Sequence, residues 1–275
     1  MIAEGDAPTG DEARRRAHMP DGTREILDFR SLGSDHRRLA ALLRPGLSVL
    51  DVGCGTGAIT RGIAEAVGPE GRAVGVDVNP SMIEAARSAH RRVPGLSFYV
   101  IDVHALPFRG EFDIVAAARV LQWLADPESA LRGMTKGLRR GGRIVVLDYN
   151  HEKVSWTPEP PASMRRFVEA FLRWRAAAGL DNAIADRLEK LLAAVGLTAI
   201  TSTDQSEITR RSDPDFETRA GIWATVAATR GHQMVADGAI SEGARRAAEV
   251  EYRAWLSEAA QSHVQYLLAV EGVRP

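Results

Sequence analysis

The sequence contains very little cysteine and almost no net charge. Cys54 is its one cysteine among 275 residues, so no intramolecular disulfide can form, which fits a reducing compartment. The formal net charge is −1, whereas a nucleic-acid-binding protein usually has a basic excess or a basic stripe. The short arginine clusters are scattered and are typical of solvated helix ends and turns. We therefore expect no nucleic-acid partner.

Long hydrophobic runs are also missing. No segment approaches the ~20 apolar residues that a membrane span needs. The first 20 residues include Glu4, Asp6, Asp11 and Glu12 and do not resemble a signal peptide. With 45% hydrophobic and 26% charged residues, the chain has the composition of a globular protein with a sizeable core. These features predict a cytoplasmic protein without a membrane partner.

The most informative stretch is Val49–Ala58, which reads Val-Leu-Asp-Val-Gly-Cys-Gly-Thr-Gly-Ala. A short apolar run ends at Asp51, three alternating glycines follow, and a helical pattern begins at once. Glycine is needed where the backbone turns at positive φ or where a ligand approaches closely. The start of the helix adds unpaired N–H groups and a partial positive charge. The stretch therefore predicts a strand, a tight turn and a helix that together hold a small polar or anionic ligand.

Two further strand-like segments also end in an acid. Arg72–Asp77 ends at Asp77, and Leu96–Asp102 ends at Asp102. An acid at the end of the second strand of a βαβ unit can accept hydrogen bonds from ribose hydroxyls.

Two ligand classes fit the glycine loop and these strand-end acids. One is a dinucleotide such as NAD, whose G-x-G-x-x-G/A fingerprint is met loosely by Gly53, Gly55 and Ala58. The other is S-adenosylmethionine (SAM).

Four ordered segments between about Leu42 and Tyr149 together resemble the class I SAM-dependent methyltransferases. The chain resembles the small-molecule enzymes of the ubiquinone/menaquinone-biosynthesis group. Asp51–Gly57 resembles motif I, in which the acid and glycines face the amino-acid end of SAM. Ile101–Phe108 resembles the motif whose acid binds the adenine amino group, and Phe112–Leu124 resembles strand four and the segment beside the methionine part. The resemblance implies that SAM is bound by Asp51, Gly53, Gly55, Gly57, Asp77, Val78, Met82, Asp102, Val103, Arg119 and Trp123.

The alternation of strand and helix patterns predicts right-handed βαβ units and a parallel sheet. We expect an α/β fold with a Rossmann-like, seven-stranded, mostly parallel sheet and helices on both faces. The resemblance implies that the last strand is antiparallel. The expected strands are Ser48–Val52, Ala73–Val78, Ser97–Ile101, Asp113–Ala117, Arg143–Asp148, about Leu197–Thr203 and Val264–Glu271.

Two helical inserts and the N-terminus have the place and size of a lid over the ligand. We expect an irregular segment over 149–161, and long helical stretches over 215–237 and 241–261. The predicted division is an N-terminal segment (1–30), a SAM-binding core (31–148), a helical insert (149–180), more core (181–212), a second insert (213–260) and the last core strand (261–275).

Methyl transfer from a sulfonium is an in-line SN2 displacement, which needs alignment and, for some acceptors, a base. His151 and Tyr149, where the sheet enters the first insert, are the preferred candidate catalytic residues, and Asp148 and Glu152 are further candidates for the base. We expect no metal site. Aromatic residues of the inserts favour a flat or apolar small-molecule acceptor; they are Trp156, Phe167, Phe171, Trp174, Trp223 and Trp255.

Two other functions remain open at this point. An NAD(P)-dependent oxidoreductase fits the glycine loop, but it leaves the segment around Asp102 without a role. A SAM-binding protein that does not transfer methyl groups fits the same motifs, because a fold does not determine a function. The sequence also leaves open the acceptor atom and the oligomeric state, a homodimer included.

Overall fold

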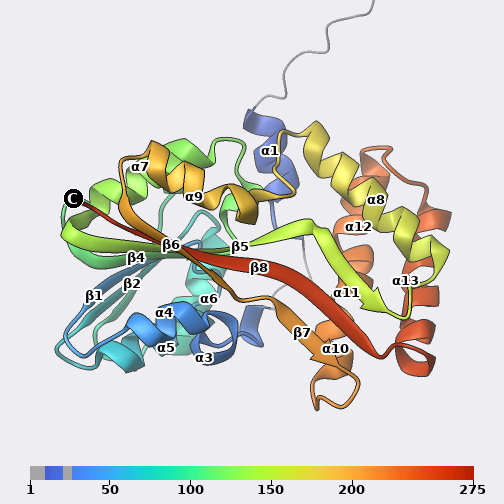
Figure 1. Ribbon diagram of the computed structural model, residues 1–275, viewed down its shortest axis with the longest axis horizontal. Helices are drawn as coiled ribbons and strands as arrows, with labels where there is room; N and C mark the ends of the chain where they lie inside the picture. Colours follow the sequence, from blue (N-terminus) through green and yellow to red (C-terminus); the bar gives the residue numbers. More distant parts are fainter. Residues whose placement is uncertain (1–9, 21–26) are drawn as a thin grey trace, which may run out of the picture.

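The computed structural model describes residues 10–20 and 27–275. A central sheet crosses the molecule with helices on both sides (Figure 1). Its strands are β1 (Ser48–Val52), β2 (Arg72–Asp77), β3 (Leu96–Val100), β4 (Phe112–Ala118), β5 (Leu138–Thr157), β6 (Thr198–Asp204), β7 (Glu207–Arg210) and β8 (Ser262–Val273).

The strand order is β3-β2-β1-β4-β5-β8-β6, and β7 pairs with β8. Neighbours from β3 through β5 are parallel, and β8 runs antiparallel to β5, β6 and β7. The α/β fold and the mostly parallel sheet are therefore confirmed, with the short strand β7 as an eighth strand beyond the seven expected. The chain reverses its strand order at β1 and β4, where ligands of such sheets bind.

Alternating residues of each central strand enter different cores, because successive side chains point to opposite faces. Val49 belongs to the core beneath α4 (Arg37–Leu42) and α5 (Ala58–Val67), whereas Leu50 belongs to the core beneath α7 (Pro127–Gly137) and α9 (Ile184–Ala194). Helix α6 (Pro80–His90) packs on β3, and the short α3 (Leu32–Asp35) packs on α5. Single turns η1 (Val103–Ala105) and η2 (Leu121–Trp123) follow β3 and β4.

Strand β5 is much longer than the sequence pattern predicted. The expected strand ended at Asp148 and an irregular segment followed, but β5 continues to Thr157. The antiparallel partner β8 accompanies it as far as the pair Thr157↔Ser262, with a register shift between Asn150 and Ser155. The prediction was wrong because pairing with a strand more than 100 residues later stabilises a segment whose own pattern is polar and uneven.

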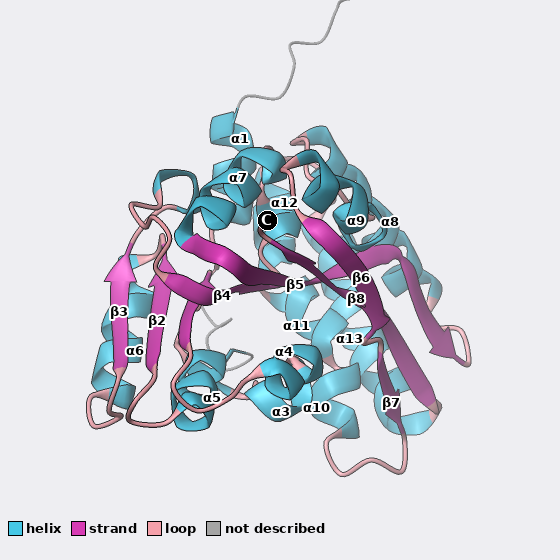
Figure 2. Cartoon of the chain, turned by 60° about the vertical axis from the view of Figure 1, so that its left-hand side comes forward, coloured by secondary structure: helices cyan, strands magenta, loops and turns pink. Residues whose placement is uncertain are grey.

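The second insert also differs from the prediction. The long helix expected over 215–237 is divided into α10 (Phe216–Ala220), α11 (Ile222–Ala228) and α12 (Arg230–Ala236). It breaks at Gly221 and at Thr229, whose ψ of −78° is not that of a regular helix. With α8 (Ala162–Ala177) and α13 (Glu242–Glu258), these helices form a group that we call the outer helices. They lie beyond the ends of β5 and β8, on the side of the molecule away from β3 (Figure 2).

The outer helices have their own hydrophobic core, which includes Met164, Phe167, Trp223 and Tyr252. At the N-terminus, α1 (Gly10–Ala17) is helical. Parts of the predicted N-terminal segment, residues 1–9 and 21–26, lie outside the described residues. Within residues 10–20 and 27–275, no helix is both long and apolar enough to cross a membrane.

Substitution of Tyr252 by Phe should destabilise the core of the outer helices. The Tyr252 hydroxyl is fully buried, donates to the Ala220 carbonyl (2.8 Å) and accepts from Trp156 Nε1 (3.0 Å). Its loss leaves a buried donor and a buried acceptor unpaired, which should lower the free energy of unfolding by about 1–3 kcal/mol. Urea denaturation measures the change. The same substitution at Tyr99, which is 44% exposed, should change stability by less than about 0.5 kcal/mol; equal effects would contradict the assignment.

Candidate active site

A cavity of about 890 Å³ lies at the carboxyl ends of the central strands. One side, which we call the loop wall, is formed by the loops after β1, β2, β3 and β4. The opposite side, which we call the outer wall, consists of Phe171, Ile222, Trp223, Val226 and Arg230 from α8, α11 and α12. Helix α1 closes a third side, and Tyr149 and His151 on β5 lie at the base.

The structure brings nearly all predicted cofactor residues to this cavity. The predicted residues that line it are Asp51, Gly53, Gly55, Asp77, Val78, Met82, Asp102, Val103, Arg119 and Trp123. Gly57 is not among the lining residues. It precedes α5 with φ 80°, and a Cβ there would lie 2.5 Å from Phe98 Cζ. Glycine at this position is therefore required by backbone conformation and by packing.

The glycine loop is held in shape by Asp77. Its carboxylate accepts hydrogen bonds from the amides of Gly55 and Asn79, each at 2.9 Å. Gly53 approaches the next loop so closely that a Cβ would lie 2.4 Å from Val120 Cγ2. Asp51 accepts from Thr60 Oγ1 at 2.7 Å, and burial raises the pKa of its carboxyl to about 7. Burial also raises the pKa of Asp77.

Helix α1 connects the loop wall with the outer helices. Arg14 lies 3.4 Å from the Asp102 carboxylate. Arg15 makes two hydrogen bonds with Asp237, at 2.7 and 2.9 Å. Arg230 donates from Nη1 to the carbonyls of Arg16 (2.6 Å) and His18 (3.2 Å), near the C-terminus of α1, where a cation is favoured by the helix dipole.

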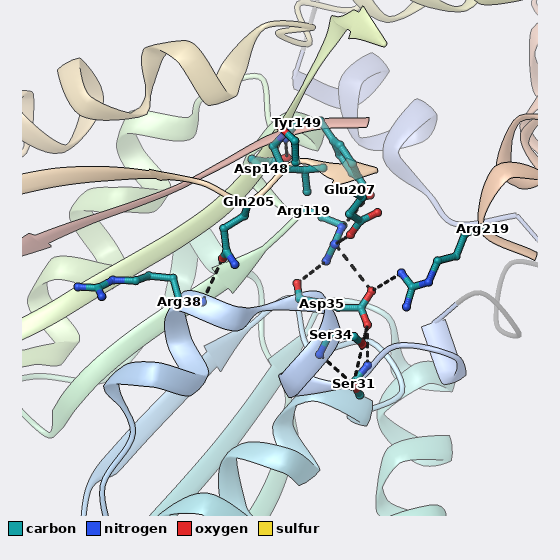
Figure 3. Close-up of polar contacts among 12 residues, drawn as sticks. Ser31, Ser34, Asp35, Arg38, Arg119, Asp148, Tyr149, Gln205, Glu207 and Arg219 are labelled. Atoms are coloured by element: carbon teal, nitrogen blue, oxygen red, sulfur yellow. Dashed lines mark hydrogen bonds and ion pairs between the residues drawn. The ribbon is translucent and has the colours of Figure 1, made fainter. Parts of the chain in front are cut away.

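Arg119 is the centre of a buried polar cluster beneath the cavity (Figure 3). It donates from Nε to the Tyr149 hydroxyl (2.7 Å) and from Nη1 to the Asp35 carbonyl (3.2 Å), and it forms an ion pair with Glu207. Burial disfavours its charge, but Tyr149, Glu207 and Asp35 outweigh that effect and hold the pKa of Arg119 above its usual value. Its φ of 62° is uncommon for a residue with a side chain.

Gln122 determines which nitrogen of His151 carries the proton. The Gln122 amide Nε2 donates to the Arg119 carbonyl (3.3 Å), so its Oε1 is the group that faces His151 Nε2 at 2.6 Å. His151 therefore donates from Nε2, and Nδ1 keeps its lone pair. Burial, together with the nearby charge of Arg175, holds the pKa of His151 well below its usual value. His151 is thus a neutral hydrogen-bond acceptor at the cavity.

Several other candidates lie elsewhere. Asp148 is fully buried behind the cavity, where it accepts hydrogen bonds from the amides of Tyr149 and Gln122. Glu152 is exposed. Of the six aromatic residues singled out in the inserts, Phe171 and Trp223 line the cavity; the four that do not are Trp156, Phe167, Trp174 and Trp255, which pack among the outer helices.

Sequence reasoning missed Gln122 and Arg230. Gln122 had a signal, because it is the one polar residue between Val120 and Leu124, directly after a strand that ends at the ligand edge of the sheet. Arg230 had none, because only the break between α11 and α12 and the position of α1 bring it to the cavity.

Comparisons with known proteins agree with this site. A family model described as a methyltransferase domain matches residues 43–217. The ubiquinone/menaquinone biosynthesis C-methyltransferase of Hahella chejuensis is 38% identical over 112 residues, which are 39% of this chain and 45% of that enzyme. The corresponding enzyme of Shewanella frigidimarina is 36% identical over 122 residues, which are 43% and 49% of the two chains. The chain thus spans less than half the length of these curated relatives.

Solved structures share the fold at low identity. Phosphoethanolamine N-methyltransferase 2 of Haemonchus contortus, in complex with phosphomonomethylethanolamine and S-adenosylhomocysteine, has a TM-score of 0.56 and 16% identity, over 94% of this chain and 54% of that one. The [4+2]-cyclase SpnF has a TM-score of 0.54 and 20% identity, over 90% and 85%.

The fold and the site define a Rossmann-like class I methyltransferase, a class whose methyl donor is SAM. The chain belongs to the methyltransferase domain family. The resemblance that the four motifs suggested is therefore confirmed.

His151 should remain neutral when histidines on the surface become protonated. Its folded-state pKa is depressed, so as the pH falls below about 6.5 the unfolded chain takes up a proton that the native state does not, and this residue then lowers stability. Nitrogen-detected NMR of the imidazoles should show a neutral Nε2–H tautomer in wild type. Gln122→Glu should raise the pKa of His151, because a carboxylate favours the imidazolium. Titration of His151 at its ordinary value in wild type would contradict this reading.

Proposed function

We propose that this chain transfers a methyl group from SAM to a small molecule bound in the same cavity. The observation that carries the proposal is that two walls of different chemistry face each other across one cavity. Three strand-end acids and the glycine loop lie on the loop wall, and a neutral histidine lies between that wall and an aromatic outer wall. A cavity of about 890 Å³ is large enough for a nucleotide-sized donor and a small acceptor together.

The residues of the loop wall fit SAM. Asp77 lies where it can bind the ribose hydroxyls, and Asp102 lies where it can bind the adenine amino group. The absence of a side chain at Gly53 lets the glycine loop pack against Val120 beside the cavity. SAM supplies a methyl group activated on a sulfonium sulfur, and its transfer leaves S-adenosylhomocysteine. The curated relatives are C-methyltransferases by name, which supports a methyl-transfer role for this chain.

The residues around the acceptor act by orientation, proton acceptance and exclusion of water. His151 Nδ1 accepts a proton or a hydrogen bond from the acceptor, because Gln122 holds the opposite nitrogen as the donor. Tyr149 is fixed by Arg119, so its oxygen has a defined position at the base of the cavity. Alignment for an in-line SN2 displacement then comes from a rigid base and a closed outer wall.

The outer wall favours a small, flat and largely apolar acceptor. Phe171 and Trp223 meet edge to face with ring centroids 5.6 Å apart, and Ile222 and Val226 extend the apolar surface. Such walls bind aromatic or conjugated molecules by contact area and leave orientation to a few polar groups.

The predicted inserts and N-terminal segment act as a lid over this cavity. Helix α1 lines the cavity and is tied to Asp237 and Arg230 of the second insert, while Arg14 reaches the Asp102 carboxylate. Entry of the donor therefore requires these contacts to open. The core comprises 31–148, 181–212 and 261–275 together with the rest of β5 to Thr157, and the lid comprises 158–180, 213–260 and the described part of 1–30.

A second function is a SAM-assisted reaction without methyl transfer. The low pKa of His151 makes it a weak base, and the [4+2]-cyclase SpnF has the same fold. The two functions differ in one product, because only methyl transfer releases S-adenosylhomocysteine from SAM.

SAM and S-adenosylhomocysteine should raise the melting temperature, and NADH should not. At a ligand concentration 100 times Kd, binding stabilises the native state by about 2.7 kcal/mol, which corresponds to a shift of several degrees for a chain of this size. Differential scanning fluorimetry measures the shift. Asp77→Ala should abolish it, because Asp77 holds the glycine loop, and Glu70→Ala, at an exposed turn, should preserve it. A shift with NADH alone would overturn the proposal.

His151→Asn should reduce turnover far more than donor binding. Loss of a positioned proton acceptor typically lowers kcat by about 10²–10⁴-fold, whereas the acids that would bind the donor lie on the loop wall and His151 lies on β5 at the base of the cavity. Turnover is measured as the release of S-adenosylhomocysteine in the presence of a panel of small aromatic acceptors. Binding at the donor site is measured by calorimetry with S-adenosylhomocysteine. His232→Asn, at an exposed residue, is the matched control. Undiminished turnover in the His151 variant would remove it from the reaction, and absence of turnover with SAM bound would favour the second function.

A further inference from the structure

The acids that line the cavity lie on one side of it, together with Arg14 and Arg119, whose own partners are Asp102 and Glu207. The acids that line it come from α1 and the loop wall, and they are Asp11, Asp51, Asp77, Asp102 and Asp126. The outer wall contains a single charged residue, Arg230, and no acid. The acidic side suits a cationic donor, and the opposite side therefore favours a ligand of the opposite charge.

Arg230 has no carboxylate partner within the described part of the chain. Its guanidinium donates hydrogen bonds to main-chain carbonyls and to the Gln233 side chain, and it lies 3.8 Å from the centroid of Trp123. The residue is 5% exposed. Burial, together with Arg175, lowers the pKa of Arg230 to about 9, so the side chain is still a cation at neutral pH. A buried cation without an anion is costly.

Two further donors behind the same surface lack acceptors. Arg175 Nη1 and Trp223 Nε1 are buried and have no hydrogen-bond partner among the described residues. Arg175 contacts the opposite end of this region, with its guanidinium 4.3 Å from the Trp123 centroid and 5.5 Å from the Phe171 centroid. Native proteins leave few buried donors unpaired, so this part of the cavity has an excess of donors and positive charge.

The charge of Arg175 is offset in part by the carboxylates of Asp148 and Asp181, and the other titratable groups around this region do not offset the charge of Arg230. His151 is neutral, Tyr149 is bound to Arg119, and the charge of Arg119 is balanced by Glu207 and Asp35. Other groups on the surrounding elements are His18 after α1 and Arg30 before α3. The arginines of α1 have their own carboxylate partners, Arg14 with Asp102, Arg15 with Asp237 and Arg16 with Glu12.

We propose that the methyl acceptor is a planar organic acid that binds as its anion, with its negative charge at Arg230 and its ring against Phe171 and Trp223. This inference rests on the proposed function and names the substrate class for that site. A carboxylate or a phenolate on an aromatic ring supplies the same chemistry, namely an anionic oxygen on a flat apolar body. An anion also needs no strong base, which fits the low basicity of His151.

Binding of charged and neutral ligands of the same shape tests the inference without any turnover. With S-adenosylhomocysteine at saturation, benzoate should bind at least about tenfold more tightly than benzamide, a difference of about 1.4 kcal/mol. Arg230→Gln should remove the preference and Arg230→Lys should retain part of it. Arg246→Gln, at an exposed arginine of α13, should leave it unchanged. Arg15→Gln should also preserve it, because it weakens the tie between α1 and Asp237 without removing a charge from the cavity.

The second possible anionic group, a phenolate, is tested with a phenol whose neutral and ionised forms differ in colour. The apparent pKa of bound 4-nitrophenol, read from its absorbance, should fall by about one unit in wild type, a fold-change of ten in favour of the anion. A benzoate preference without this shift assigns the negative charge to a carboxylate, and both together assign it to the phenolic oxygen. If S-adenosylhomocysteine binds but benzamide binds as well as benzoate and the phenol pKa does not fall, the inference is overturned and the proposed function stands. If S-adenosylhomocysteine does not bind, the proposed function itself fails.

Discussion

The buried guanidinium of Arg119 determines the shape of the cavity base. Removing a charge from water is expensive, and the cost is offset only where partners surround it. These partners come from three segments far apart in sequence, with Asp35 on α3, Tyr149 on β5 and Glu207 on β7. The positive φ of Arg119 turns its carbonyl toward Gln122, and Gln122 in turn sets the tautomer of His151. One ion cluster thus fixes both candidate catalytic side chains, and strain at such a position is common at functional sites.

The parts of the molecule that the sequence predicted are those determined by local pattern. The glycine loop at Gly53 and Gly55 and the strand-end acids Asp51, Asp77 and Asp102 came together because carboxyl ends of parallel strands meet at one edge of the sheet. The length of β5, the breaks at Gly221 and Thr229, and the approach of Arg230 to α1 depend on contacts between distant segments. No window of sequence contains that information, because tertiary packing overrides local propensity there.

The long ribbon of β5 and β8 explains how the sheet region and the outer helices, which have separate hydrophobic cores, form one site. The sheet has its own cores on both faces, and the outer helices have another around Phe167 and Tyr252. The ribbon extends from the first region into the second, so His151 projects from a strand that belongs to both. Small relative movements of the two regions would change the width of the cavity, whereas His151 stays attached to the rigid sheet. Contacts made by α1 with Asp237 and Arg230 close the third side of this arrangement.

In this site the exclusion of water from the cavity and the basicity of His151 oppose each other. A closed, apolar outer wall excludes water and strengthens every electrostatic interaction inside, but the same burial keeps His151 neutral and makes it a poor base. A neutral acceptor with a weakly acidic proton would therefore gain less from His151 than from a stronger base. An acceptor that arrives as an anion avoids this difficulty, because the proton is lost in water and the unpaired charge of Arg230 then offsets the cost of bringing the anion into the cavity. The weak base and the cationic wall therefore act together, because the attraction of Arg230 for an anion lowers the demand on His151, which accepts the remaining proton or hydrogen bond of the acceptor.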